Sequence, residues 1–174
     1  GWVRFAEKNY PDLLGHLSSC KSPHQMFGAM VKSYYAKKYN VDPKKICMVS
    51  VMPCIAKKYE CQREEMEVDG LRDVDYVITT RELSRMIKQA NIEFTQLQDD
   101  VFDEPMGEAT GAGAIFGTTG GVMEAALRSA YYLVTKKNPE PDAFKAVRGL
   151  DGWKEAEFDL DGTDIKVAVA SGLG

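Results

Sequence analysis

Cys54 is the residue of this sequence whose type and position best suit chemistry. It lies in VSVMPCIAKKYE, residues 49–60, where an apolar, β-branched run gives way to charge. The run predicts a strand, so Cys54 would follow a strand end, at the edge of a sheet where α/β proteins bind ligands. If a helix begins there, its free N–H groups and the cation of Lys57 would favour the thiolate. A thiolate is a nucleophile or a ligand for a soft metal, and the absence of a nearby base in the sequence favours the metal ligand.

A second possible metal site would consist of His16, Cys20 and His24. His16, Cys20 and His24 are four residues apart, which would align three ligands on one helix face. Pro23 breaks this alignment, because a helix ends before it and a new helix starts there. A zinc site is therefore a weak interpretation of these three residues.

Two further cysteines lie seven residues before and seven residues after Cys54, and neither is expected to bind a metal. Cys47 lies inside an apolar run and is expected to be a buried small hydrophobe. Cys61 lies in a polar segment and is expected to be solvated. From spacing alone, a solvated helix face is the better explanation of Lys57, Lys58 and Glu60.

The glycine-rich segment GEATGAGAIFGTTGG, residues 107–121, invites comparison with nucleotide-binding loops. Its glycines Gly111, Gly113 and Gly117 have the spacing GxGxxxG, one residue longer than the dinucleotide fingerprint, and no apolar strand leads into them. The chain has no Gly-Lys pair, which excludes a phosphate-binding P-loop. The segment predicts a tight loop that lets backbone come close to another group.

Helix signals occur at three places in the chain. Ser22 is a candidate N-cap, with Pro23 in the first turn and Gln25 closing a capping box. Thr79 and Glu82 form a second capping box, and a third helix is expected from about residue 121 to 135. Residues 91–118 read mostly as loop.

Strand-like runs alternate with these helices and indicate the fold class. An Asp-Gly pair at 161–162 predicts a hairpin between the last two runs. The alternation favours an α/β fold, with a mainly parallel sheet flanked by helices and an antiparallel hairpin near the C-terminus. The expected strands are Ile46–Met52, Tyr76–Thr79, Phe144–Leu150, Lys154–Leu160 and Ile165–Ala170.

Composition excludes several classes of protein. With 44% hydrophobic and 28% charged residues and a net charge of −4, the chain is globular and is not expected to bind nucleic acid or an anionic membrane. No run of 18 apolar residues could span a bilayer. The four cysteines lack a CxxC pair and are expected to be reduced, which favours a cytoplasmic protein. The first and last residues suggest an excerpt of a longer polypeptide.

Several segments together resemble the iron-only (FeFe) hydrogenases. MPCIAKKYE resembles the family's second signature, Met-Pro-Cys-x-x-Lys-x-x-Glu. GWVRFAEKNYP is similar to the sequence after the first signature, and LSSCKSPHQMFG to a Ser-Pro-Gln-Gln region. FDEPMGEATGAGAIFGTTGGVMEAALR is similar to the glycine-rich block, and VRGLDGWKEAEFDLDGTDIKVAVASGL to the stretch before the third signature. The resemblance covers essentially the whole chain and implies one fragment, residues 1–174, of a single two-lobed catalytic domain.

The resemblance implies the cofactor and its ligands. The family's H-cluster joins a 4Fe–4S cubane through a cysteine to a two-iron unit with CO, cyanide and a dithiolate. Cys54 would be one of four cysteine ligands, with one other before Gly1 and two beyond Gly174, so the fragment alone is expected to lack the cofactor and activity. Around the two-iron unit, the implied roles are a cyanide contact for Lys57, pocket lining for Met52, Pro53 and Phe116, a position near the dithiolate for Ser22, and proton relay for Ser18.

His24 is a departure from the family pattern. It occupies a position where the family often has glutamine, near a carbonyl ligand of the distal iron, and it is followed by Gln25. A histidine there could change local polarity, sensitivity to CO or oxygen, or proton access. The sequence alone leaves these alternatives open.

The function implied by the resemblance is reversible reduction of protons to dihydrogen by an oxidoreductase of an anaerobic bacterium. Implied partners are a ferredoxin or nicotinamide-linked electron donor that docks through other domains, and maturation proteins. Three alternatives are a hydrogenase-like iron–sulfur assembly protein, a hydrogen-sensing paralogue with low turnover, and a plain α/β binding module with a structural thiol. The block GTTGGVMEAALR and the pairing of Met52 with Lys57 favour the enzyme over the assembly protein.

Overall fold

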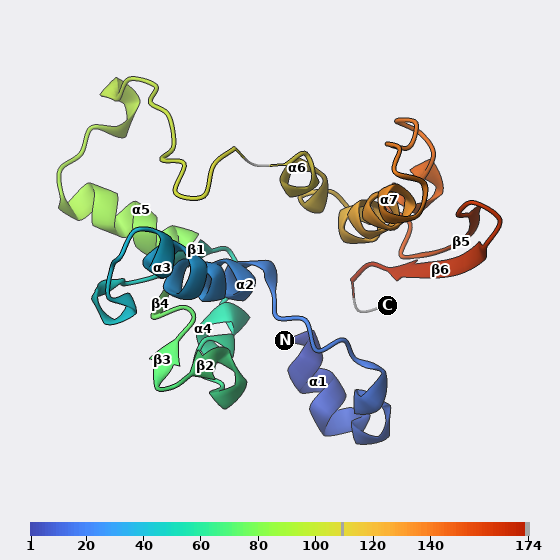
Figure 1. Ribbon diagram of the computed structural model, residues 1–174. Coiled ribbons are helices and arrows are strands. Elements are labelled where there is room, and N and C mark those ends of the chain that lie inside the picture. Colours follow the sequence, from blue (N-terminus) through green and yellow to red (C-terminus); the bar gives the residue numbers. More distant parts are fainter. Residues whose placement is uncertain (109, 173–174) are drawn as a thin grey trace. The chain divides into compact units, whose positions relative to one another are not determined.

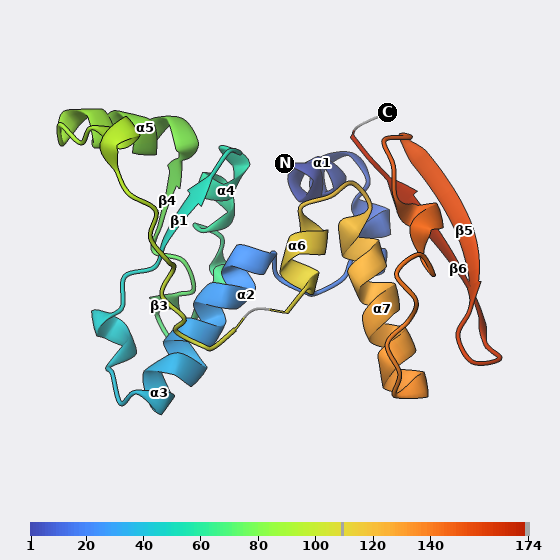
Figure 2. The same ribbon diagram turned by 90° about the horizontal axis from the view of Figure 1, so that it is seen from above.

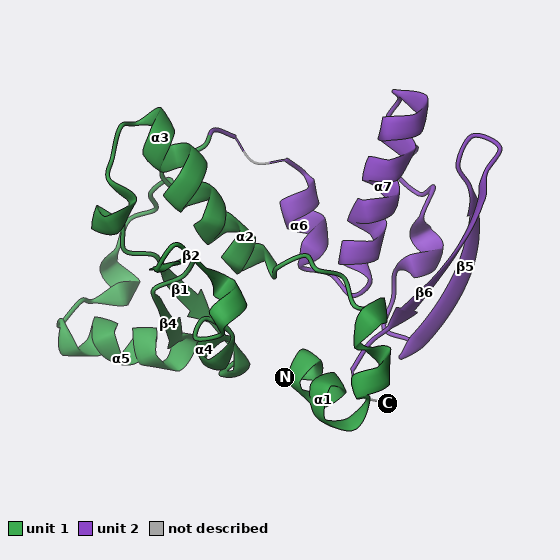
Figure 3. Cartoon of the chain, turned by 60° about the horizontal axis from the view of Figure 1, so that its bottom comes forward, with its two compact units in different colours: residues 1–106 green, residues 107–174 purple. Residues whose placement is uncertain are grey.

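The computed structural model describes residues 1–108 and 110–172 (Figure 1). The chain divides into two compact units, residues 1–106 and 107–174 (Figure 3). Each unit mixes helices with a small sheet, and the expected α/β class is confirmed. None of the helices in the described parts of the chain is long and apolar enough to cross a membrane.

The first unit is organised around a parallel pair of strands, β1 (Val49–Met52) and β4 (Tyr76–Thr79). Val49 pairs with Tyr76 and Met52 with Thr79, so the carboxyl ends of both strands meet at one edge. β1 is shorter than the expected Ile46–Met52: a 3-10 helix ends at Lys45, and the N–H of Met48 donates to the carboxylate of Asp75 at 2.6 Å rather than to a neighbouring strand. A short antiparallel hairpin, β2 (Glu67–Val68) and β3 (Leu71–Arg72), lies between them in sequence.

Helices supply most of the remaining structure of the first unit (Figure 1). The segment after Ser22 is one continuous helical stretch that passes from α-helix through a π-helical turn and back. α4 is the short helix that follows β1, and α5 follows β4. The elements are α1 (Trp2–Asn9), α2 (Pro23–Met30), the π-helix Val31–Tyr35, α3 (Ala36–Lys38), α4 (Ala56–Glu60), α5 (Thr80–Gln89), and 3-10 helices at Pro11–His16, Glu64–Met66 and Phe94–Gln96.

The two expected capping boxes have different outcomes. The box at α5 is confirmed: Thr79 accepts a hydrogen bond from the Glu82 N–H, and the Glu82 carboxylate accepts one from the Thr79 N–H at 2.7 Å. The box at α2 is wrong. Ser22 is the N-cap residue of α2, but its side chain makes no capping hydrogen bond and instead donates to the carboxylate of Glu60. A charged acceptor forms the stronger bond and draws the hydroxyl away from the helix end.

Glu82 makes the stability of the first unit depend on pH. Hydrogen bonds from Lys58, and then from Thr79, lower its pKa from 4.5 to about 2. The folded state therefore gains stability from this carboxylate above pH 4.5, and loses that contribution as the pH falls towards 2. We expect Glu82→Gln to be less stable than the wild type at pH 7 and equal to it near pH 2, in urea unfolding followed by circular dichroism. Lys58→Met should weaken this pH dependence. A stability difference between Glu82→Gln and the wild type that is the same at every pH would contradict the prediction.

The small core of the first unit lies behind the sheet edge. Cys61, Val74 and Val77 are buried together, and Met52 packs against them. None of the residues of α5 is buried. Burial of Cys61 reverses the prediction that it is solvated, and the exposure of Cys47 reverses the prediction that it is buried.

The second unit consists of a long helix packed on one face of a hairpin (Figure 2). The expected helix is confirmed as α7 (Gly121–Thr135), and it follows the short helix α6 (Ala112–Phe116). The expected hairpin is confirmed as β5 (Trp153–Asp159) and β6 (Asp164–Ala170). At its turn, Asp161 and Gly162 both have positive φ, as a type I′ turn requires. The core consists of Leu127, Phe144, Val147 and Leu160.

The predicted strand Phe144–Leu150 is wrong. Residues Lys145–Val147 form a 3-10 helix, which places the side chains of Phe144 and Val147 on one side, three residues apart, and both are buried in the core. The apolar residues of this segment therefore reflect a single buried turn.

Two glycines explain the tight loop expected in residues 107–121. Gly120 has φ of 81°, and a Cβ at this position would overlap the carbonyl oxygen of Val147. A Cβ at Gly121 would overlap the carbonyl oxygen of Ile115. The group that the glycine-rich loop approaches is thus the backbone of the second unit itself, on both sides of the start of α7.

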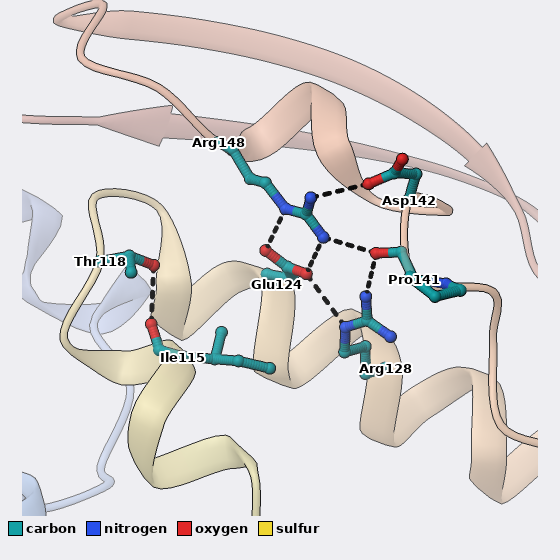
Figure 4. A network of polar contacts seen from close by, with 7 residues as sticks. All are labelled: Ile115, Thr118, Glu124, Arg128, Pro141, Asp142 and Arg148. Atoms are coloured by element: carbon teal, nitrogen blue, oxygen red, sulfur yellow. Dashed lines mark hydrogen bonds and ion pairs between the residues drawn. The ribbon is translucent and has the colours of Figure 1, made fainter.

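A buried carboxylate ties α7 to the segment that follows it (Figure 4). Both oxygens of Glu124 accept hydrogen bonds from Arg148, at 2.9 and 2.8 Å, and one also accepts from Arg128 at 3.0 Å. Both guanidinium groups donate to the carbonyl oxygen of Pro141, and Arg148 pairs with Asp142 at 2.9 Å. These bonds hold the start of α7 to residues 141–148.

Candidate functional site

Cys54 lies two residues beyond β1, at the edge where the carboxyl ends of the parallel strands meet. Its side chain is exposed. A turn follows directly, in which the N–H of Lys57 donates to the carbonyl oxygen of Cys54 at 3.3 Å, and α4 continues from there. The thiol of Cys54 is therefore exposed to solvent at the end of the strand. The turn keeps Lys57 close to Cys54 in the chain.

Glu60, at the end of α4, gathers the polar side chains of this region. One carboxylate oxygen accepts a hydrogen bond from the Ser22 hydroxyl, and it lies 3.3 Å from Nε2 of His24. The other oxygen accepts from the ammonium of Lys57 at 2.6 Å. On its other side, the His24 ring has Nδ1 2.9 Å from the hydroxyl of Ser50. The five residues come from three segments: the start of α2, β1 and α4.

The environment of this cluster sets its charge state. Burial opposes ionisation of Glu60, but the hydrogen bonds from Lys57 and Ser22 outweigh it and hold the pKa of Glu60 below its ordinary value. Burial lowers the pKa of His24, outweighing the attraction of Glu60 for a positive ring. At neutral pH Glu60 is therefore a carboxylate and His24 a neutral imidazole.

A cavity of about 660 Å³ adjoins this cluster within the first unit. Lys57 and Glu60 contribute to its wall from α4, and Ser18 and Ser22 contribute from the segment before α2. The start of α1 closes another side, where the guanidinium of Arg4 lies 4.5 Å from the ring centre of Tyr59. The cavity therefore brings together three of the predicted site residues, Ser18, Ser22 and Lys57.

The other predicted site residues lie outside the cavity wall. Met52 is partly buried against the core, and Pro53 is exposed between it and Cys54. His24 is connected to the cavity through Glu60. Phe116 is the last residue of α6, in the second unit, and its side chain is partly exposed.

Of the exposed cysteines in the described residues, Cys54 lies at the sheet edge and Cys20 lies in the cavity wall. Among residues 1–108 and 110–172, no three His, Cys, Asp or Glu side chains gather closely enough to hold a metal ion. Cys61 is a poor candidate, since burial raises the pKa of its thiol and it donates to the carbonyl oxygen of Lys58. Cys47 lies with Lys44 and Lys45 in a separate hollow of the surface.

Sequence reasoning missed Glu60 and Ser50 as members of the cluster. A signal for Glu60 existed, because Lys57 and Glu60 are three residues apart and such pairs meet on a helix. Ser50 faces a residue 26 positions away in sequence, and no local pattern predicts that contact.

Comparison with known proteins places these features in a family. A periplasmic Fe hydrogenase large subunit from Nitratidesulfovibrio vulgaris is 57% identical over 99% of this chain, and iron hydrogenase 1 from Clostridium pasteurianum is 55% identical over 99%. The chain spans 41% and 30% of their lengths. An apo FeFe-hydrogenase structure from Chlamydomonas reinhardtii superimposes with a TM-score of 0.76 and 42% identity, covering 99% of this chain and 50% of that one.

Some more distant relatives are named for a different function, the assembly of iron–sulfur clusters. A cytosolic Fe–S cluster assembly factor from Xenopus tropicalis is 33% identical over 95% of this chain. The hydrogenases are much more similar, and all 174 residues match the family described as the iron only hydrogenase large subunit, C-terminal domain. The chain therefore belongs to the C-terminal domain family of the iron-only hydrogenase large subunit.

Proposed function

We propose that this chain forms part of the catalytic domain of an FeFe hydrogenase that reversibly reduces protons to dihydrogen. The observation that carries the proposal is the exposed thiol of Cys54 at the sheet edge, with the Lys57 ammonium one turn later beside a cavity. Both units would belong to the same domain, which is supported by the match of the family to residues 1–174.

Cys54 is the residue that would hold the cluster. Cysteine thiolates are the usual ligands of iron–sulfur clusters, and the exposed thiol of Cys54 is available for this. The other three ligands would come from outside the described residues. The resemblance puts one of them just before Gly1, and Gly1 lies against Ala56, two residues from Cys54. The isolated chain is accordingly expected to hold no cluster and to be inactive.

The cofactor would supply the redox chemistry, and the residues of the chain would bind, orient and pass protons. Lys57 would donate a charge-assisted hydrogen bond to an anionic ligand of the two-iron unit. Ser18 would pass protons, because a hydroxyl both donates and accepts. Its oxygen accepts from the Cys20 N–H at 3.1 Å, and this bond orients the hydroxyl in the cavity wall. The resemblance implies that Met52 and Pro53 would contact the two-iron unit and that Ser22 would lie near its dithiolate, and it implies a packing role for Phe116.

The proposal includes the setting of the enzyme. A ferredoxin or a nicotinamide-linked protein would exchange electrons with it, and maturation proteins would load the two-iron unit. The four free cysteines are compatible with a reducing cytoplasm, although one relative is periplasmic by name.

Replacement of Lys57 tests the proposed function at one residue. We expect Lys57→Met, in the complete subunit loaded with cluster, to lose about 10- to 100-fold of its hydrogen evolution, because a hydrogen bond from a charged donor is lost in a dry pocket. The matched control is Lys58→Met. Lys58 pairs with Glu82 at 2.7 Å and is not part of the cavity wall, so this variant should keep its activity. Equal activity of the two variants would argue against a role for Lys57.

A further inference from the structure

His24 is placed to fix the position of another side chain. Its ring is almost buried, with 7% of the side chain exposed, and it lies between β1 and the end of α4. Ser50 contacts one ring nitrogen and Glu60 the other. A histidine held at both nitrogens, in a neutral state, has little freedom to rotate or to exchange protons with water.

The partners of His24 select one tautomer. Glu60 is ionised and can only accept, so the neutral ring must carry its proton on Nε2 and donate it to Glu60. Nδ1 then accepts from the hydroxyl of Ser50. The direction of hydrogen bonding therefore runs from Ser50 through His24 to Glu60.

This arrangement determines which oxygen of Glu60 faces Lys57. His24 and Ser22 both donate to one carboxylate oxygen, Oε1. The other oxygen, Oε2, accepts from the Lys57 ammonium. With Oε1 occupied by two donors from a fixed helix start, the carboxylate cannot rotate without breaking both bonds.

We propose that His24 is a positioning residue for Lys57, acting through Glu60. In the Nε2–H tautomer the ring offers one acceptor and one donor on opposite sides, as the side-chain amide of glutamine also does. The histidine thus keeps the hydrogen-bonding pattern of an amide, and it serves to orient the ammonium rather than to carry protons. The significance for catalysis rests on the proposed function of Lys57.

The test compares two replacements of His24 in the complete chain without cluster. His24→Gln keeps an acceptor and a donor, whereas His24→Leu keeps the approximate size and loses both. The readout is the rate at which the Lys57 ammonium protons exchange with solvent, measured by nitrogen-15 NMR and assigned with Lys57→Arg. We expect the glutamine variant to exchange within about twofold of the wild type, and the leucine variant about tenfold faster, because a hydrogen bond to a charged group is lost.

A second test measures the tautomer of the His24 ring by nitrogen-15 NMR, and it does not require that the leucine variant folds. The ring signals that disappear in His24→Gln are those of His24. We expect the Nε2–H tautomer in the wild type, and a larger share of the Nδ1–H form in Ser50→Ala, which removes the donor to Nδ1. A predominantly Nδ1–H or charged ring in the wild type at pH 7 would overturn the inference.

Activity of the loaded complete subunit separates this inference from the proposed function. We expect His24→Gln to keep hydrogen evolution and its pH profile, while His24→Leu loses about tenfold at every pH. A glutamine variant as impaired as the leucine variant would show that His24 carries protons, and would overturn the positioning role. If the NMR results hold but the wild type evolves no hydrogen, the proposed function fails and the structural link from His24 to Lys57 stands.

Discussion

Replacement of Cys54 by serine in the complete subunit is expected to remove the cluster and with it hydrogen evolution. Serine keeps the size and polarity of the side chain, but its oxygen is a poor ligand for iron–sulfur clusters, which are held by thiolates. Loss of even an outer partner of a metal ligand costs about 10- to 100-fold in metal affinity or activity, so loss of a ligand should cost at least about 100-fold. The measurement is iron and acid-labile sulfide per chain after anaerobic reconstitution, with electron paramagnetic resonance of the reduced protein.

Cys47→Ser is the matched control for this experiment. Cys47 is also an exposed, free cysteine and lies only seven residues away, but in a separate hollow of the surface. This variant should keep its iron, its resonance signal and its activity. If Cys54→Ser keeps iron and sulfide as well as the control does, Cys54 is not a ligand and the site proposed around it fails.

The second large effect is expected on stability, at Glu124 in the second unit. Hydrogen bonds from Arg148 hold the pKa of Glu124 below its ordinary value, and the carboxylate is almost fully buried beneath two guanidinium groups. Glu124→Leu leaves both arginines without their shared partner. Breaking a buried pair costs about 3–5 kcal/mol, but Arg148 is 41% exposed and can turn to water, so we expect a loss of about 2 kcal/mol.

Urea unfolding followed by Trp153 fluorescence measures this loss. Trp153 lies at the start of β5, and Trp2→Phe in the background removes the fluorescence of the first unit. Asp142→Ala is the control, since Asp142 pairs with the same Arg148 from an exposed position and should cost less than about 1 kcal/mol. The lowered pKa also predicts that the contribution of Glu124 is present above pH 4.5 and disappears in acid. Equal losses in the two variants would show that burial of Glu124 does not matter.

Local signals explain which elements could be predicted from the sequence. The capping residues of α5 and the Asp-Gly turn of the β5–β6 hairpin act within a few residues, and both predictions were confirmed. The helix expected from about residue 121 to 135 was also confirmed. The predicted strand at 144–150 failed because two buried aromatic and aliphatic residues three positions apart serve a single 3-10 turn as well as a strand.

Contacts between distant segments explain what could not be predicted. Cys47 and Cys61 were assigned the wrong burial, because burial depends on which segments cover a residue and not on the polarity of its neighbours. The hydroxyl of Ser22 fits a capping box by sequence, yet it donates to Glu60, 38 residues away. Cys54 and Lys57 are site candidates that a strand end and a resemblance identify in the sequence, and they stay predictions. The contacts of Ser50 with His24 and of Glu60 with Lys57 became visible only in the folded chain.

Hydrogen production by the complete, anaerobically matured subunit tests the central claim most directly. With reduced methyl viologen as electron donor, we predict that gas chromatography detects hydrogen from the wild type and only background from Cys54→Ser. A wild-type protein that holds its iron–sulfur cluster and its two-iron unit, yet evolves no hydrogen and takes none up, would contradict the account. That result would favour a role like that of the cytosolic Fe–S cluster assembly factors, to which the chain is more distantly related.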